Sequence, residues 1–142
     1  MKHQLIQQAI KAADEAITSE DFDALMAFYA DDATLDIKPG LIANGKEQIR
    51  KAFIAIAEYF GHKLVVEQGE MQIIQGADTA LVIMETILTV NDQAGVPARI
   101  TRRATYVFRE VPDGKWLCVI DNSYGTDILA GQREEVLTAK IE

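Results

Sequence analysis

The sequence predicts an α+β fold, with helices in the first part of the chain and a long antiparallel sheet in the remainder. Apolar residues recur every three or four positions up to residue 60, as in amphipathic helices. After Gly61 the pattern changes, and Val, Ile, Thr and Tyr become frequent, as in strands. The connections between these strands are too short for parallel crossovers, so we expect an antiparallel meander.

Three helices are expected before Gly61. The first covers residues 3–18, and the second is a short helix that Ser19 caps and whose buried stripe ends at Tyr29. The third begins after Asn44, which forms a capping-box pattern with Glu47 three residues later. Gly61 is typical of the residue that follows a helix C-terminus.

Four strands follow, separated by the turn sequences QGAD, NDQAG and PDG. Their expected ranges are 63–74, 79–91, 97–110 and 115–124, and residues 33–37 add a short edge strand. Because the helices have apolar stripes that need a partner, they are expected to cover one face of this sheet.

The second face of the sheet predicts a dimer. Within residues 79–91, Leu81 and Ile83 alternate with Val82 and Met84, so apolar side chains point to both faces. Helices can cover only one of these faces. We therefore expect a homodimer that packs through the other sheet face.

Composition limits the possible functions. A chain of 142 residues is the usual size of one domain, expected to span residues 1–142. The formal charge of −8 argues against nucleic acids and anionic membrane surfaces as partners. No apolar run is long enough to span a membrane, and the N-terminus lacks the apolar core of a signal peptide. The single cysteine, Cys118, forms no internal disulfide, which fits a cytoplasmic location.

Several motifs, in this order along the chain, resemble those of the nuclear transport factor 2-like superfamily. They are FYADDATLD, GKEQIRKAF, DTALVIMETILTV, RRATYVFRE and DGKWLCVIDNSYGTD. The resemblance covers roughly residues 5–127 and is strongest to ketosteroid isomerases, SnoaL-like polyketide cyclases and the bacterial proteins related to them. It implies a cystatin-like fold, in which a cone-shaped curved antiparallel sheet wraps around the N-terminal helices and encloses an apolar pocket. Enzymes, binding proteins and association domains share this fold.

The catalytic residues that the resemblance implies for ketosteroid isomerases are not reproduced in this chain. The position of their catalytic aspartate aligns with Ile37, and that of their tyrosine on the first helix falls near Ala13. The position of their second acid falls on Ala104 or Tyr106. A different carboxylate must therefore act as the base if the chain is an enzyme.

Three acids are candidates for that base, with Asp121 first. Asp121 and Asn122 end an apolar strand, and strand alternation sends one of them into the pocket and the other outward. Asp36 is a second catalytic candidate, and the alternative is a solvated strand residue. Glu85 interrupts an apolar strand, so it is either paired in the core or lies in the pocket. A buried Asp121 would have a raised pKa and could serve as a general base.

Other polar side chains are candidates for ligand binding. Arg103, next to Arg102, could pair with Asp121 or bind a ligand carboxylate, and the alternative is an ordinary salt bridge. Tyr29 and Tyr106 either pack in the core or donate a hydrogen bond to a ligand oxygen.

No metal or cofactor site is expected from the sequence. His3 and His62 are far apart and adjoin no Cys or acid cluster, and no phosphate loop or dinucleotide fingerprint is present. The function expected is a cofactor-independent isomerase, cyclase or lyase that acts on a small hydrophobic molecule through a carboxylate base. The alternatives are a protein that binds such a molecule unchanged and a dimeric association module.

Overall fold

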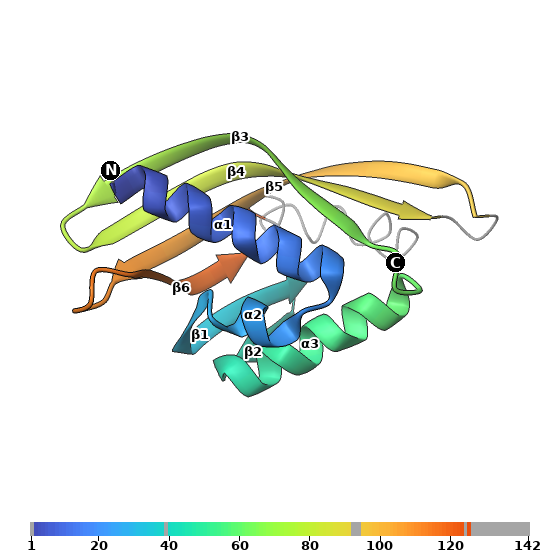
Figure 1. Ribbon diagram of the computed structural model, residues 1–142, viewed down its shortest axis with the longest axis horizontal. Coiled ribbons are helices and arrows are strands. Elements are labelled where there is room, and N and C mark those ends of the chain that lie inside the picture. The colour runs from blue at the N-terminus through green and yellow to red at the C-terminus, as the bar shows by residue number, and fades with distance from the viewer. Residues whose placement is uncertain (1, 39, 92–94, 124, 126–142) are drawn as a thin grey trace.

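The α+β architecture expected from the sequence is confirmed (Figure 1). The computed structural model describes residues 2–38, 40–91, 95–123 and 125. The helices in this part of the chain are α1 (Lys2–Ser19), α2 (Phe22–Met26) and α3 (Gly45–Tyr59). The strands are β1 (Tyr29–Lys38), β2 (Leu41–Asn44), β3 (Val65–Gly76), β4 (Thr79–Asn91), β5 (Pro97–Glu110) and β6 (Trp116–Asn122).

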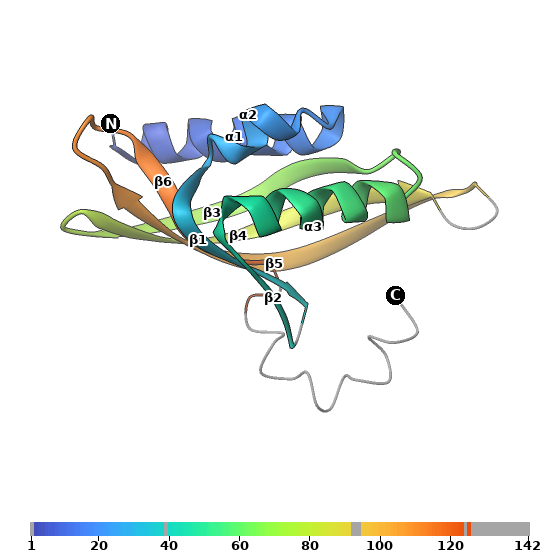
Figure 2. The ribbon, with the colours of Figure 1, turned by 90° about the horizontal axis from the view of Figure 1, so that it is seen from below.

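The strands form one curved sheet in the order β2-β1-β6-β5-β4-β3 (Figure 2). The run from β3 to β6 is the expected antiparallel meander, and β2 pairs antiparallel with β1. The β1–β6 pair is parallel. Through this pair, β1 and β2 extend the sheet beyond the meander of β3 to β6. Most of the turn expected at residues 91–95 lies outside the described residues.

The expectation of a short edge strand at residues 33–37 is wrong. Strand β1 begins at Tyr29 and lies inside the sheet, between β2 and β6. Tyr29 therefore belongs to a strand and not to the second helix. Strand β2 was not expected at all, and Gly40, with a φ of 84°, stands in the turn that leads into it. The pairing of β1 with β6 joins segments that are far apart in the sequence, which local patterns do not report.

The start of α3 differs from the expected capping box. Asn44 stands at the N-cap, but its side chain makes no capping hydrogen bond. Its Oδ1 accepts a hydrogen bond from the Thr34 hydroxyl instead, at 3.1 Å. The backbone N–H of Asn44 donates to Oε1 of Gln48 at 2.8 Å, so Gln48 takes the role expected of Glu47. The hydrogen bond from Thr34 of β1 thus occupies the Asn44 oxygen that would otherwise cap the helix.

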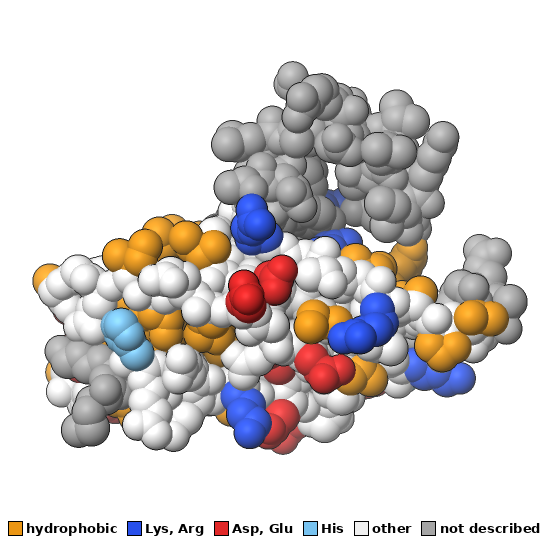
Figure 3. Space-filling view, turned by 90° about the horizontal axis from the view of Figure 1, so that it is seen from above, with side chains coloured by type: hydrophobic (Ala, Val, Ile, Leu, Met, Phe, Trp, Pro, Cys, Tyr) orange, Lys and Arg blue, Asp and Glu red, His pale blue; other side chains and the backbone are white. Residues whose placement is uncertain are grey.

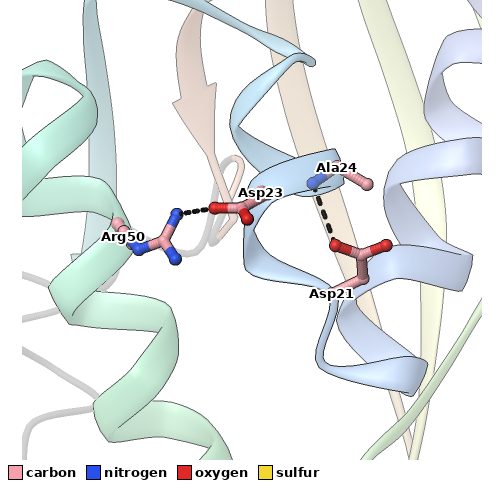
Figure 4. Close-up of polar contacts among 4 residues, drawn as sticks. All are labelled: Asp21, Asp23, Ala24 and Arg50. Carbon is pink, nitrogen blue, oxygen red and sulfur yellow. Dashed lines mark hydrogen bonds and ion pairs between the residues drawn. The ribbon is translucent and has the colours of Figure 1, made fainter.

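Helix α2 is capped by Asp21, and the expected cap Ser19 is instead the last residue of α1. The Asp21 side chain accepts a hydrogen bond from the backbone N–H of Ala24 at 3.1 Å (Figure 4). In the same view, Asp23 pairs with Arg50 of α3, with 2.6 Å between Oδ1 and Nη1. The short helix is therefore held both by its own cap and by an exposed ion pair to α3.

The core lies between the helices and the concave face of the sheet. Alternate residues of β4, such as Val82 and Met84, are buried together with Ile10 of α1 and Ile49 of α3. Burial of this apolar area stabilises the fold and fixes which strand residues point inward. Among the helices that the structure describes, none combines the length and the apolar character needed to cross a membrane.

The outer sheet face carries exposed apolar side chains, including Ile74 of β3, Leu81 of β4 and Ile120 of β6. Figure 3, which views the molecule from above relative to Figure 1 and not onto this outer face, shows hydrophobic side chains in separate groups among charged ones. Leu81 pairs in register with Ile74 and with Val107, so these apolar residues are adjacent across three strands. A homodimer through this face stays a prediction.

We expect Asp21→Ala to lower the free energy of unfolding by about 1 kcal/mol, because it removes a helix N-cap. Asp23→Ala breaks an exposed ion pair and should cost about 0.5 kcal/mol or less. Urea unfolding followed by circular dichroism would measure both variants. Equal losses of unfolding free energy in the two variants would show that the cap of α2 stabilises the protein no more than the exposed ion pair does.

Light scattering at micromolar concentration should give a mass of about twice 15.7 kDa if the outer face is a dimer interface. Leu81→Lys should shift the mass to that of one chain, because it places a charge in the apolar contact. Leu5→Lys is the control, since Leu5 is similarly exposed but lies on α1. A wild-type monomer would contradict the prediction.

Candidate functional site

A cavity of about 510 Å³ lies between α1, α3 and the concave face of the sheet. This volume is within the range of small-molecule sites, roughly 300–1,000 Å³. Most of its wall is apolar, with Ile17 from α1, Phe53 and Ile56 from α3, and Leu35 and Ile37 from β1. The exposed side chains of Leu41 and Tyr59 are also part of the lining, so they mark its open side.

A small number of polar side chains interrupt this apolar wall. They come from α1, β1, β4, β5, β6 and the residue after β6, and they are Asp14, Lys38, Thr86, Arg102, Tyr106, Asp121 and Ser123. Few polar groups in a mostly apolar cavity are typical of sites that bind and orient a small molecule.

Asp121 is a buried member of this polar set, and both of its carboxyl oxygens have a hydrogen-bond donor. Its residue is only 4% exposed, and it lies opposite Tyr106 of β5 and Leu35 of β1 in the sheet register. The Tyr29 hydroxyl donates to Oδ2 of Asp121 at 2.6 Å, and the Ser123 hydroxyl donates to Oδ1 at 3.2 Å. Both carboxyl oxygens therefore accept a hydrogen bond while the group remains at the cavity wall.

Packing fixes Tyr29 in position to make this bond. Tyr29 is 1% exposed and contacts Phe28 edge-on, with 5.0 Å between the ring centroids. Its ring also lies 6.2 Å from that of Phe53 on α3. Burial raises the pKa of the Tyr29 hydroxyl well above its usual value, and the charge of Asp121 raises it further. Tyr29 thus remains a protonated donor toward Asp121.

The carboxyl group of Asp121 has a pKa raised to about 6, chiefly because burial disfavours its charged form. The hydrogen bonds from Tyr29 and Ser123 lower the pKa, and the charge of Asp36 raises it. Asp121 is therefore a carboxylate at neutral pH, but a more basic one than an exposed aspartate. Such a group is suited to accept a proton.

Asp14 of α1 is a site residue that the sequence analysis missed. It is 8% exposed, and burial raises the pKa of its carboxyl group to about 7, with further increases from the charges of Asp121 and Glu15. A signal was present in the sequence, since Asp14 follows Ile10 by four positions and precedes Ile17 by three. An acid on the apolar stripe of a helix faces the same interior as that stripe.

Asp36 does not line the cavity. Its neighbours Leu35 and Ile37 do, so strand alternation turns Asp36 to the opposite face. There it lies beside Ile42 of β2 and Asn122 of β6 in the register. The alternative of a solvated residue is also wrong, because Asp36 is only 8% exposed and burial raises its pKa.

Asn122 likewise lies outside the cavity lining, so Asp121 is the member of this pair that faces inward. The Asn122 side chain closes a turn after β6. Its Nδ2 donates to the carbonyl of Gly125, and its Oδ1 accepts from the Gly125 N–H, both at 3.1 Å. This bonding gives Asn122 a structural role in the turn.

Glu85 and Arg103 are not in the cavity lining either. They are partners in the register of β4 and β5, and their inward-facing neighbours Met84 and Ala104 are buried. Arg102 is the arginine that lines the cavity. The expected pair of Arg103 with Asp121 is therefore wrong, because the two side chains belong to opposite faces of the sheet.

The sequence candidates that the structure brings together are thus Asp121, Tyr29 and Tyr106. Burial raises the pKa of Tyr106 well above its usual value, and the charges of Asp121 and Asp14 raise it further. Tyr106 is therefore a protonated hydroxyl group at the cavity wall. Across the described ranges, no cluster of three or more His, Cys, Asp or Glu side chains could hold a metal ion.

A family model described as the SnoaL-like domain matches residues 6–119. A search of curated proteins finds no match.

Solved structures share the fold at low sequence identity. Aln2 from a Streptomyces species superposes with a TM-score of 0.79 at 17% identity, covering 92% of this chain and 95% of its own. A candidate dehydratase of the NTF2-like family from Streptomyces avermitilis has a TM-score of 0.73 at 20% identity, covering 85% and 94%. A candidate ketosteroid isomerase from Shewanella frigidimarina has a TM-score of 0.70 at 16% identity, covering 82% and 92%. At these identities the likeness shows the fold alone.

The raised pKa of Asp14 predicts a stability that depends on pH. Below about pH 3 the carboxyl group is mostly protonated in both the folded and unfolded chains, and its burial carries no ionisation penalty. As the pH rises toward 7, the unfolded chain releases this proton first, so stability is lost until the folded pKa is passed. Relative to wild type, Asp14→Asn should therefore become more stable by about 3 kcal/mol between about pH 4.5 and 8.5.

Urea unfolding of both proteins across this pH range would measure the difference. Glu58→Gln is the matched control, since Glu58 is an exposed carboxylate on α3. The control should follow wild type at every pH. A constant difference between Asp14→Asn and wild type would mean that Asp14 titrates alike in both states.

Proposed function

This chain belongs to the SnoaL-like domain family, and we propose that it is a cofactor-independent isomerase, cyclase or lyase that moves a proton on a small hydrophobic molecule. In this proposal the substrate lies in the cavity between α1, α3 and the sheet. Asp121 is the general base. The apolar wall selects the substrate by size and shape, and the few polar groups orient it.

The observation that carries the proposal is the setting of Asp121. A carboxylate in an apolar wall is costly unless donors support it, and here two hydroxyl groups do so. The support keeps the group ionised near neutral pH, while burial keeps its pKa at about 6. A base whose pKa lies close to the operating pH is efficient in both accepting and returning a proton.

The expected step is removal of a proton from a carbon next to a carbonyl group. Asp121 takes the proton, and the electrons of the C–H bond form a carbon–carbon double bond as charge moves onto the carbonyl oxygen. Return of the proton to another carbon gives an isomer, attack of the new nucleophile on a second carbonyl gives a cyclised product, and loss of a leaving group gives a lyase reaction. All three outcomes begin with the same base.

A binding protein that holds its ligand unchanged is the second candidate. It is favoured by the predominance of apolar side chains in the cavity wall, which supports binding without any reaction. Binding and proton transfer can be measured separately on the same ketone, so the two functions are distinguishable.

We expect the protein to catalyse deuterium exchange from D₂O into the methyl group of 2-acetylnaphthalene, an apolar enolisable ketone, as followed by proton NMR. Asp121→Asn should slow this exchange at least about 100-fold, since an amide cannot act as the base. Binding of the ketone, measured by equilibrium dialysis, should change much less.

Glu85→Gln is the control for this assay, because it removes a carboxylate on the other side of the sheet and should leave the exchange rate unchanged. Full exchange in Asp121→Asn would place the base elsewhere. Tight binding of several enolisable ketones by the wild type with no exchange in any of them would favour the binding protein.

A further inference from the structure

The carboxyl group of Asp14 is a second polar feature of the cavity wall that the base mechanism leaves unused. Its Oδ2 atom is buried and makes no hydrogen bond with any described residue. Buried carboxyl oxygens in folded proteins nearly always have a partner. Because Asp14 is more than nine-tenths buried and lines the cavity, the missing partner is expected to come from the ligand.

The surroundings of Asp14 favour its neutral form. The titratable or charged side chains that line the same cavity are Lys38 of β1, Tyr59 of α3, Arg102 and Tyr106 of β5, and Asp121 of β6. On its own helix, the charge of Glu15 acts on Asp14, and across the cavity the charge of Asp121 does so. Burial and both charges act in the same direction.

Hydrogen bonding distinguishes the two acids in the cavity. Asp121 accepts bonds from the hydroxyl groups of Tyr29 and Ser123, which stabilise its ionised form. Among the described residues, none donates a hydrogen bond to Oδ2 of Asp14. When the pair carries one proton, that proton therefore resides mainly on Asp14.

We propose that Asp14 is a second catalytic residue, whose carboxyl group donates a hydrogen bond and then its proton to the substrate oxygen while Asp121 removes a proton from the adjacent carbon. This inference rests on the proposed function. As the C–H electron pair becomes a carbon–carbon double bond, the π electrons of the carbonyl group move to oxygen, which bonds to the proton of Asp14. The products of this step are an enol, a protonated Asp121 and an ionised Asp14, so atoms and charge balance.

The proposal also specifies the ligand. A protonated carboxyl group offers a hydrogen-bond donor, so the ligand presents a neutral acceptor oxygen, such as that of a ketone, to Asp14. An ionised Asp14 would instead attract an amine. A ketone and an amine of similar size therefore test the two states.

The test measures binding of 2-acetylnaphthalene and of 1-(2-naphthyl)ethylamine at about pH 5.5 and 8.5 by equilibrium dialysis. The wild type should bind the ketone at least about fivefold more tightly at the lower pH, because Asp14 then carries its proton. Asp14→Asn keeps a donor but cannot titrate, so its affinity should differ less than about twofold between the two pH values. Glu58→Gln should behave as wild type.

The deuterium exchange assay supplies a second readout. Asp14→Asn should bind the ketone but slow exchange at least about tenfold, since its amide cannot give a proton to the oxygen. Asp14→Leu, which has no donor, should bind the ketone more weakly than Asp14→Asn at both pH values.

The outcomes separate the two proposals. Equal ketone affinity of the wild type at both pH values, or preferred binding of the amine, would overturn the role of Asp14. Exchange that is lost in Asp121→Asn but unchanged in Asp14→Asn would likewise overturn it and leave the base in place. A ketone that binds at neither pH would overturn both proposals.

Discussion

One buried hydrogen bond, from the Tyr29 hydroxyl to Asp121, joins the two strands on which the polar part of the cavity depends. Tyr29 begins β1 and Asp121 lies near the end of β6, and these strands form the parallel pair of the sheet. In an apolar interior an ionised carboxylate without a donor would take up a proton instead. The bond therefore links the two strands and favours the charged form of Asp121.

The same mostly apolar environment gives two aspartates different properties. Burial raises the pKa of both Asp14 and Asp121, and the hydroxyl donors lower that of Asp121 alone. Because the two charges repel each other, the two carboxyl groups titrate as a coupled pair. The first proton is released mainly from Asp121, whose charged form the hydroxyl donors stabilise. A small difference in hydrogen bonding thus gives the two carboxyl groups different proton affinities within one cavity.

The helices and the strands of the meander could be predicted because their signals are local. Hydrophobic period and turn residues report α1, α3 and the strands from β3 to β6 directly. The β1–β6 pairing and the inward member of the Asp121–Asn122 pair could not be predicted in this way. Register shifts beside Val107 and within β1 interrupt simple alternation, so sequence parity does not determine which side chain enters the cavity. The position of Asp14 on a helical stripe could be read from the sequence, since it lies four residues after Ile10 and three before Ile17.

The position of the acids separates this cavity from the arrangement that the resemblance to ketosteroid isomerases implies. Ile37, which aligns with their catalytic aspartate, is part of the apolar wall here. Across the parallel pair, Leu35 of β1 is the register partner of Asp121, so the acid lies on the neighbouring strand. On α1, the position of the isomerase tyrosine falls near Ala13, and the polar group that lines the cavity here is the neighbouring Asp14. A base on a different wall approaches a bound molecule from a different direction. The carbon that reacts in a relative therefore cannot be inferred for this chain from the shared fold. If the proposed function holds, the substrate of this chain is therefore to be identified from the positions of its own two acids.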